Sequence, residues 1–331
     1  MRILEPMFNI RIQKMIHFSV IGLLVLLAGC SDRVENSHNQ SGQPVVALVM
    51  KSLANEFFVN MAEGAKNHQA NSLSDEKTAY QLLVNGIKNE SDLAQQVSLI
   101  DQMVAAGADA IVIAPADSKA IVPALARAIN AGVVVVNIDN KLDAEVLQQY
   151  QLDIPFVGPD NKAGSYKVGK YLANHLDAGA QAAILEGIPS AFNSQQRRAG
   201  FEDALREAEI KVVSIQSAAW DQTKAADITS ALLIKYPDLD AILCANDNMA
   251  LGAASAIEQA GKSEKIRIVG FDNISAVRQL VGQGKILATA DQQAHLLAVY
   301  GIEYAIEALQ GNSTLIDRTT PVELVIKESI D

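Results

Sequence analysis

The chain has 331 residues and a formal net charge of -11 at pH 7, and 49% of its residues are hydrophobic while only 5% are aromatic. An acidic surface repels the phosphate backbone of DNA or RNA, so we expect no nucleic acid as a partner. The length is sufficient for two domains of ordinary size. Because Ala, Val, Ile and Leu dominate the apolar residues, we expect an α/β fold with buried parallel strands covered by helices.

Residues 1–29 have the pattern of a signal peptide. Arg11 and Lys14 precede an apolar run, residues 16–28, that is too short to span a bilayer. The run ends in a Leu-Ala-Gly-Cys sequence that looks like a bacterial lipobox, so we expect Cys30 to be acylated and to hold the mature chain at a membrane. The alternative is a plain secretory signal with an incidental cysteine. Residues 30–43 are polar and are expected to form a tether.

These features predict a periplasmic or other extracytoplasmic protein that is lipid-anchored to a membrane. Cys244 is the other cysteine of the sequence, and it follows an apolar run. With Cys30 acylated, Cys244 has no partner, so we expect no internal disulfide and a buried, inert thiol.

After the tether, short β-branched runs alternate with amphipathic segments of helical length, which predicts parallel sheets with helices on both faces. The expected strands are residues 45–50, 79–84, 110–113, 133–138, 182–185, 211–215, 241–243, 266–269 and 286–289. The expected helices are residues 91–106, 119–130, 162–176, 194–207, 223–235, 249–259 and 293–310.

This series of strands is too long for one sheet of ordinary width. The stretch 153–160, which contains Pro155, Gly158 and Pro159, is the best candidate for a passage between two sheets. We also expect Gly107, Gly132 and Gly261, which lie just past helix ends, to adopt the left-handed backbone of a helix cap. The expected fold is therefore α/β, with two doubly wound lobes.

Polar side chains follow the expected strands at their carboxyl ends, where open α/β sheets bind ligands. These residues are Lys51 with Asn55, Asp139 with Asn140, Asn246, Asp272 and Gln292. Carboxylates accept from hydroxyls, and amides both donate and accept, which suits a neutral polyhydroxylated ligand. Phe57, Phe58 and Trp220 are candidates to stack on the C–H face of a sugar ring.

Structural roles are the alternatives for several of these residues. Asp247 is as good a helix N-cap as a ligand contact. One of Phe57 and Phe58 could belong to the core, and Trp220 could serve packing at a helix start.

Catalytic patterns are absent from the sequence. It contains no Gly-x-Ser-x-Gly elbow, no P-loop and no complete dinucleotide fingerprint. The histidines are scattered without metal-ligand spacing, at positions 17, 38, 68, 175 and 295. We therefore expect no enzyme, no cofactor and no metal.

At these same residues the chain resembles the ribose-binding-protein family of type I periplasmic binding proteins. The resemblance runs from about residue 45 to residue 326, and its most specific pieces are residues 47–49 with 55–58, 157–161, 246–252, 269–272, 284–285 and 288–289. It implies two Rossmann-like lobes joined by a three-strand hinge, with crossovers near Pro159, Gln293 and Pro321. The implied first lobe comprises residues 44–159 and 293–320, and the second comprises residues 160–292 and 321–331.

The resemblance also implies the sugar contacts, which fall on Asn55, Phe57, Phe58, Asp139, Trp220, Asn246, Asp272 and Gln292. Three residues depart from the ribose pattern. Lys51 replaces a small hydroxyl residue, Asn140 replaces an arginine, and Gln195 stands where a further ligand arginine is usual, with Arg197 as a structural neighbour. These departures predict a ligand other than ribose, and a ketose or sugar alcohol is the expectation.

The function implied is that of the solute-binding subunit of an ABC transporter, which binds a monosaccharide or sugar alcohol by hinge closure. Its expected partners are the transporter permease and its ATPase, and the protein itself is expected to be a monomer. The alternative is a sensor lipoprotein that presents a sugar or furanosyl signal to a receptor. A LacI-type repressor would need a helix-turn-helix domain, and a hydrolase would need catalytic roles for Asp139 and Asp272.

Overall fold

In the computed structural model, which describes residues 42–73, 79–312 and 314–330, the strands form two parallel sheets and one short antiparallel pair. The first sheet has the strand order β11-β5-β4-β3-β1-β2. Its strands are β1 (Val45–Ser52), β2 (Gln81–Ile87), β3 (Ala110–Ile113), β4 (Val134–Ile138), β5 (Phe156–Pro159) and β11 (Arg318–Thr320).

The second sheet has the order β7-β6-β8-β9, and its strands are also parallel. They are β6 (Gln181–Glu186), β7 (Lys211–Ser217), β8 (Ala241–Cys244) and β9 (Arg267–Val269). Two further strands, β10 (Thr289–Asp291) and β12 (Glu323–Val325), pair with each other in antiparallel fashion.

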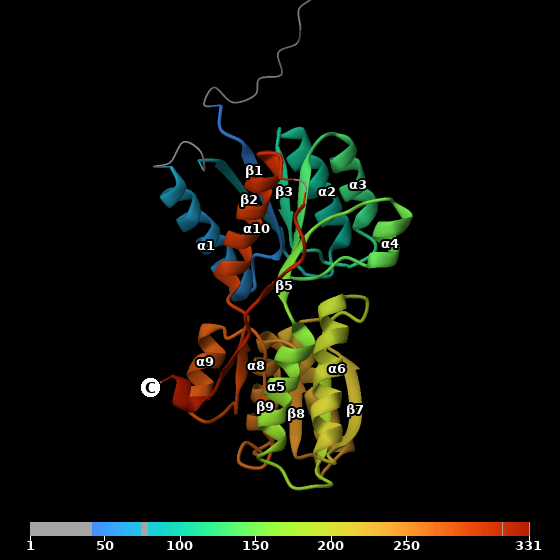
Figure 1. Ribbon diagram of the computed structural model, residues 1–331. Helices are drawn as coiled ribbons and strands as arrows, with labels where there is room; N and C mark the ends of the chain where they lie inside the picture. Colours follow the sequence, from blue (N-terminus) through green and yellow to red (C-terminus); the bar gives the residue numbers. More distant parts are fainter. Residues whose placement is uncertain (1–41, 74–78, 313, 331) are drawn as a thin grey trace, which may run out of the picture. The chain divides into compact units, whose positions relative to one another are not determined.

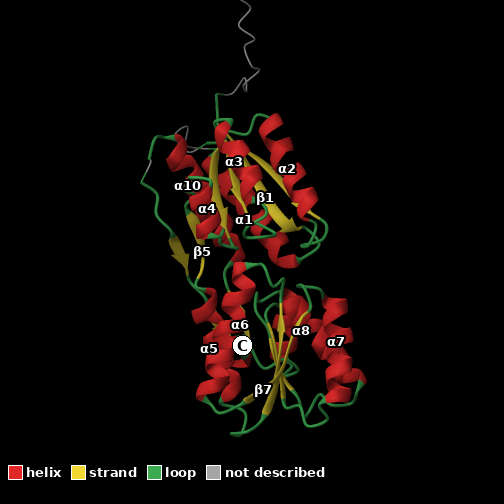
Figure 2. Cartoon of the chain, turned by 90° about the vertical axis from the view of Figure 1, so that its right-hand side faces the viewer, coloured by secondary structure: helices red, strands yellow, loops and turns green. Residues whose placement is uncertain are grey.

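Helices cover both faces of each sheet. The first sheet is flanked by α1 (Glu56–Ser72), α2 (Leu93–Ala105), α3 (Val122–Asn130) and α10 (Ala294–Leu309), with the short α4 (Ala144–Gln149) nearby. The second sheet is flanked by α5 (Asn161–Ala173) and α6 (Phe192–Glu207) on one side, and by α7 (Gln222–Lys235) and α8 (Asp247–Gln259) on the other (Figure 2). Helix α9 (Ser275–Gly282) follows β9, and a 3-10 turn spans Lys327–Ser329.

Alternation along β1 explains why two helical layers are needed. Val46, Leu48 and Met50 belong to the apolar cluster that contains α1 and α10, which lie together on one side of the sheet in Figure 1. Ala47 and Val49 belong to the cluster formed with α2 and α3. Because successive side chains of a strand point to opposite faces, a strand that is apolar throughout must be covered on both.

We call the first sheet with α1–α4 and α10 the first lobe, and the second sheet with α5–α9 the second lobe. The chain leaves the first sheet after β5, and α5 packs against α6 of the second lobe. It returns through β10 into α10, adds β11 to the first sheet beside β5, and then pairs β12 with β10. These pairings support the proposed crossovers near Pro159, Gln293 and Pro321, and hence the proposed lobe boundaries.

Most of the expected elements are confirmed with small shifts at their ends. The strand at residues 110–113 has the expected bounds, and Gly107, Gly132 and Gly261 have the expected positive φ angles of 80°, 90° and 66°. The strand expected at 286–289 is wrong in position. Ala288 makes only an isolated bridge to Val269, and the strand itself begins at Thr289.

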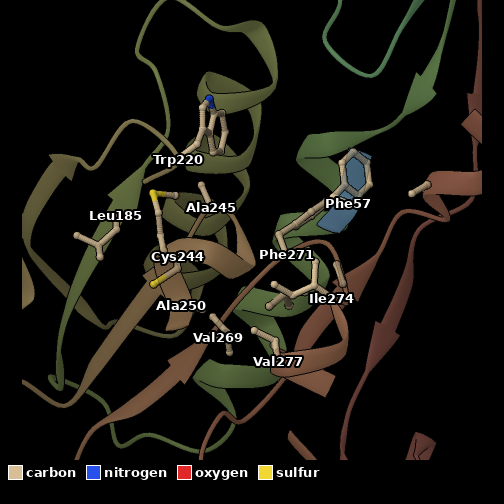
Figure 3. Close-up of a cluster of buried hydrophobic side chains, with 14 of the residues drawn as sticks. Phe57, Leu185, Trp220, Cys244, Ala245, Ala250, Val269, Phe271, Ile274 and Val277 are labelled. Carbon is tan, nitrogen blue, oxygen red and sulfur yellow. The ribbon is translucent and has the colours of Figure 1, made fainter. Parts of the chain in front are cut away.

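Figure 3 shows the apolar core around β8 and β9, with Cys244, Val269 and Val277 packed together. Cys244 is buried and free, as expected, and burial raises the pKa of its thiol above the ordinary value. The predicted signal peptide, Cys30 and the tether up to residue 41 lie outside the described residues. Among the residues that are described, no helix combines the length and the hydropathy needed to cross a bilayer.

Candidate ligand-binding site

A pocket of about 230 Å³ is lined by residues that follow strands of both sheets. The first lobe contributes side chains from the ends of β1 and β4, from the start of α1 and from the loop after β2. The second lobe contributes side chains from α6 and from the loops after β7, β8, β9 and β10. The lining residues are Lys51, Asn55, Phe57, Phe58, Glu90, Asp139, Asn193, Arg197, Trp220, Asn246, Asp272 and Gln292.

A buried ion pair lies on the first-lobe side of this pocket. Lys51 Nζ is 2.9 Å from Asp139 Oδ2, and the two side chains are only 3% and 2% exposed. Asp139 directly follows β4 and has a positive φ of 62°, a conformation that costs free energy for a residue with a Cβ atom. The Asp139 backbone N–H donates to Val157 O, which fixes this turn and aims the carboxylate at the pocket.

Asn55 and Glu90 form a second pair on the same side. Asn55 caps α1, because its Oδ1 accepts from Phe57 N at 3.1 Å, and its Nδ2 donates to Glu90 Oε1 at 3.0 Å. Burial raises the pKa of the Glu90 carboxyl above its usual range, while the Lys51 ammonium and the bond from Asn55 oppose that rise. The first lobe therefore presents two carboxyl groups and one ammonium within a small space.

Arg197 is the centre of the second-lobe side. Its guanidinium donates to Asn161 Oδ1 at 2.7 Å, to Ala245 O at 2.8 Å and to Gln292 Oε1 at 3.2 Å. It also lies 3.5 Å from Asp272 Oδ1 and 3.8 Å from the centre of the Phe271 ring. Burial lowers the pKa of this guanidinium, and the nearby carboxylates oppose the shift. The geometry fixes the planar fork before any ligand binds.

Asp272 and Gln292 complete this network. Gln292 Nε2 donates to Asp272 Oδ1 at 2.7 Å, so the amide bridges Arg197 and Asp272. Asp272 has a φ of 129°, which is strained for any residue other than glycine. Burial raises the pKa of its carboxyl well above the usual value, although the Arg197 guanidinium opposes the rise.

Aromatic rings from both lobes contact the pocket. Phe57 and Phe58 meet edge to face, with ring centres 5.1 Å apart. The Lys51 ammonium lies 5.8 Å from the centre of the Phe58 ring and 5.9 Å from that of Trp220. Figure 3 shows Trp220 and Phe57 on different elements of the chain. Flat apolar faces of this kind suit the C–H side of a sugar ring.

Three buried polar atoms of the lining lack a hydrogen-bond partner within the described part of the chain. They are Asp139 Oδ2, which faces Lys51 without hydrogen-bond angles, Asn193 Oδ1 and Trp220 Nε1. A buried polar atom without a partner costs about 1–3 kcal/mol. Two acceptors and one donor directed at one pocket therefore match a ligand that carries hydroxyl groups.

The structure brings nine of the eleven candidate residues to the pocket, all except Asn140 and Gln195. Asn140 is buried behind Asp139, where its Nδ2 donates to Pro115 O at 3.0 Å. Gln195 is exposed, and its Nε2 donates to Pro189 O at 2.8 Å. The expectation that Gln195 replaces a ligand arginine is therefore corrected, because Arg197 supplies a guanidinium to the pocket.

Helical geometry explains this correction. Asn193 and Arg197 are four residues apart on α6 and therefore share a face, whereas Gln195 lies about 200° around the helix from Asn193. The (i, i+4) pair of polar residues was the signal that could have identified both lining residues. Glu90 was missed because it lies on a loop three residues after β2 and not directly at its end.

Comparison with known proteins places this geometry in a family. The family model described as periplasmic binding protein domain matches residues 46–313. The chain belongs to the periplasmic binding proteins. This family binds solutes and is not a family of enzymes, and its members lie outside the cytoplasm.

Individual members agree with this assignment. The D-ribose/D-allose-binding protein of Pseudomonas aeruginosa is 46% identical over 308 residues, which cover 91% of this chain and 95% of that protein. A solved ABC transporter solute-binding protein from Burkholderia multivorans is 50% identical, with a TM-score of 0.83 and coverage of 86% of this chain and 99% of that one. Another, from Actinobacillus succinogenes with bound D-allose, is 35% identical, with a TM-score of 0.81 and coverage of 87% and 99%.

Proposed function

We propose that this periplasmic binding protein captures a monosaccharide of the D-ribose or D-allose kind and delivers it to the permease of an ABC transporter. The observation that carries the proposal is the pocket itself. Both lobes contribute aromatic rings to it, and both contribute buried polar atoms that have no hydrogen-bond partner among the described residues. The relatives named above, which bind D-ribose and D-allose or are transporter subunits, support the same ligand class.

The chemistry of the lining fits an aldose in its ring form. Asp139 and Asp272 accept hydrogen bonds from sugar hydroxyls, and such a bond to an ionised carboxylate contributes about 1.5–3 kcal/mol. The Arg197 guanidinium and the Lys51 ammonium donate to sugar oxygens, while Trp220 covers an apolar ring face. Because Arg197 keeps a donor fork in the pocket, the expectation of a ketose or sugar alcohol loses one of its premises, and an aldose becomes the favoured ligand.

Binding is proposed to occur by hinge closure. A solute held by Asp139 of the first lobe and Asp272 of the second can make all its contacts only when the lobes approach each other. The connections near Pro159, Gln293 and Pro321 are the proposed hinge, between a first lobe of residues 44–159 plus 293–320 and a second lobe of residues 160–292 plus 321–331.

The membrane attachment belongs to the same proposal. Acylation of Cys30 and the polar tether up to residue 43 would hold a monomeric receptor beside the permease and its ATPase. Cys30→Ala is expected to abolish labelling by radioactive palmitate. Labelling of that variant at the level of the wild type would contradict a lipid anchor at Cys30.

The direct test is isothermal titration calorimetry of the purified protein with D-allose, D-ribose, D-fructose and ribitol. We expect D-allose or D-ribose to bind with a Kd of about 1 μM or below, because a small ligand enclosed on all sides can reach about -8 kcal/mol. Tightest binding of D-fructose or ribitol would restore the ketose or polyol expectation. Heat signals at the level of buffer for all four compounds would contradict the proposed ligand class.

A further inference from the structure

Two helices of the second lobe begin without a capping residue of their own. α5, α7 and α8 start after Asp160, Asp221 and Asn246, and each of these side chains accepts a backbone N–H of the first turn. α6 and α9 start after Ala191 and Ile274, which have no side-chain acceptor. The first N–H groups of a helix have no partner inside it, so both helices need acceptors from elsewhere.

For α6, the acceptors come from the first lobe. Phe192 N donates to Ser118 Oγ at 2.9 Å, and Asn193 N donates to Asn140 Oδ1 at 3.2 Å. Burial raises the pKa of Asp117, but the backbone N–H of Ala120, the Ser190 side chain and the backbone N–H of Lys119 together hold it below its usual value. The contact with Ser190 links the same two loops. The first turn of α6 is thus capped across the boundary between the lobes.

α9 is capped in the same way by Glu56, the first residue of α1. Ser275 N donates to Glu56 Oε1 and Ser275 Oγ donates to Oε2, both at 2.8 Å. A carboxylate at a helix N-terminus also interacts favourably with the helix dipole. The two helices of the second lobe that lack caps are therefore the two that receive them from the first lobe.

The acceptors on the α6 side are held in place by the first lobe alone. Asn140 Nδ2 donates to Pro115 O at 3.0 Å, and Ser118 Oγ donates to Asn140 Oδ1 at 3.3 Å. Asn137 Nδ2 donates to Asn140 O at 2.9 Å. Because these bonds lie within one lobe, they keep Ser118 and Asn140 oriented whether or not the second lobe is in contact.

We propose that Ser118, Asn140 and Glu56 form a capping latch that favours the closed arrangement of the lobes and so raises the affinity for sugar from outside the pocket. None of the three lines the pocket. Separation of the lobes leaves the first turns of α6 and α9 to water, so the latch bonds are made only in the closed state. A ligand that selects the closed state binds more tightly when closure costs less. The latch rests on the proposed sugar binding. It gives Asn140 a role in capping α6 in place of direct contact with the ligand.

The first experiment compares latch variants with a cap variant inside one lobe. Ser118→Ala and Glu56→Ala are each expected to raise the Kd for D-allose by about threefold to tenfold, the effect of about one hydrogen bond, without changing the Tm of the sugar-free protein. The control is Asp143→Ala, since Asp143 caps α4 from within the first lobe by accepting from Val146 N at 3.0 Å. This variant should lower the Tm and leave the Kd within about twofold of the wild type.

A second variant gives α6 its own acceptor. Ala191→Ser places a hydroxyl at the capping position, where it can accept an N–H of the first turn in the open state as well as the closed one. We expect a Kd for D-allose about threefold higher, together with a Tm of the sugar-free protein that is equal or higher. Damage to the fold would lower both the affinity and the Tm. A lower affinity together with an unchanged or higher Tm in Ala191→Ser therefore identifies the latch.

A measurement of lobe closure in the sugar-free protein tests the latch independently of the proposed sugar binding. Fluorophores at Gln149 in α4 and at exposed Ile234 in α7 report the distance between the lobes by energy transfer. Ser118→Ala and Glu56→Ala should each lower the closed fraction of the sugar-free protein. If the wild type binds no sugar, the proposed function fails, and this closed fraction alone decides on the latch. An unchanged closed fraction together with wild-type affinity for D-allose in both variants would overturn the latch alone.

Discussion

The two sides of the pocket are built differently. On the second-lobe side, Arg197 is held by hydrogen bonds to side chains and a carbonyl, and Gln292 links it again to Asp272. On the first-lobe side, Lys51 and Asp139 form one ion pair, and Asp139 Oδ2 lacks a hydrogen-bond partner among the described residues. The second-lobe network is thus largely satisfied before ligand binds, whereas the first-lobe carboxylate still has bonding capacity. We therefore expect stability to depend more on the second-lobe side and affinity more on the first.

Arg197→Ala should have the largest effect on stability. It leaves Asp272 and Gln292 buried without their shared partner, and breaking a buried charged pair costs about 3–5 kcal/mol. The neighbouring Arg198→Ala is the control, because Arg198 has a 42% exposed side chain with ion pairs to Glu186 and Glu202 and should cost less than about 1 kcal/mol. Urea unfolding measures both. Equal unfolding free energies for Arg197→Ala and Arg198→Ala would contradict the idea that the buried second-lobe network stabilises the fold.

Asp139→Asn should affect affinity more than stability. The amide keeps an acceptor for Lys51, so the buried ammonium retains a partner, but it loses the charge that strengthens bonds to sugar hydroxyls. We expect the Kd for D-allose to rise about a hundredfold, from two charge-assisted bonds weakened together. Asp153→Asn, at an exposed carboxyl of the same lobe, should bind like the wild type. Calorimetry with a change below about threefold for Asp139→Asn would remove Asp139 from the binding site.

The buried carboxyls make stability depend on pH. Burial raises the pKa of Asp247 to about 7 and raises that of Asp272 as well. The native state then binds protons more tightly than the unfolded state, so the free energy of unfolding falls as pH rises from about 4, the unfolded value, to about 7. Asp247→Asn should flatten this decline. Urea unfolding of the wild type at pH 5 and pH 8 should show lower stability at pH 8, and higher stability at pH 8 would contradict the burial of these charges.

Trp220→Phe should have the smallest effect among these substitutions. Phenylalanine keeps a flat apolar face but removes Trp220 Nε1, a buried donor without a partner within the described chain. We expect the Kd for D-allose to rise about threefold to tenfold, the effect of one hydrogen bond. Trp220→Ala, which also removes the ring face, should lose more. Wild-type affinity in the phenylalanine variant would show that Nε1 does not contact the ligand.

Most of the candidate residues that the structure brings to the pocket lie at or just after the carboxyl end of a buried strand. Asp139 follows β4 of the first sheet and Asp272 follows β9 of the second, and the carboxyl ends of parallel strands meet at one edge of each sheet, so the strand pattern places each residue at the binding edge of its own sheet. That the two edges face each other follows from how the lobes pack and not from the strand pattern. Asn193 and Arg197 lie on a helix, where position around the axis decides what a side chain contacts. The family resemblance indicates Gln195 as the position of the ligand arginine, two residues before Arg197, and two residues on a helix nearly reverse the direction of a side chain.

The elements that the sequence did not indicate are short or unevenly apolar. Strands β11 and β12 have three residues each, too few for an alternating pattern to stand out. In α1, buried Phe57, Phe58 and Met61 are followed by a mostly polar stretch that contains Gly64. Glycine is needed at position 64 because a Cβ atom there would lie 2.7 Å from His295 of α10. That close approach between the helices depends on tertiary packing, which no local pattern reveals.

In the proposed function, one sugar molecule bridges the two lobes, which close around it. Small-angle X-ray scattering of the purified protein, without sugar and with saturating D-allose, measures this closure. We expect a smaller radius of gyration with D-allose, because Asp139 and Asp272 can hold the same ligand only in the closed arrangement. Superimposable scattering curves, obtained under conditions in which calorimetry shows D-allose to be bound, would contradict closure around the sugar.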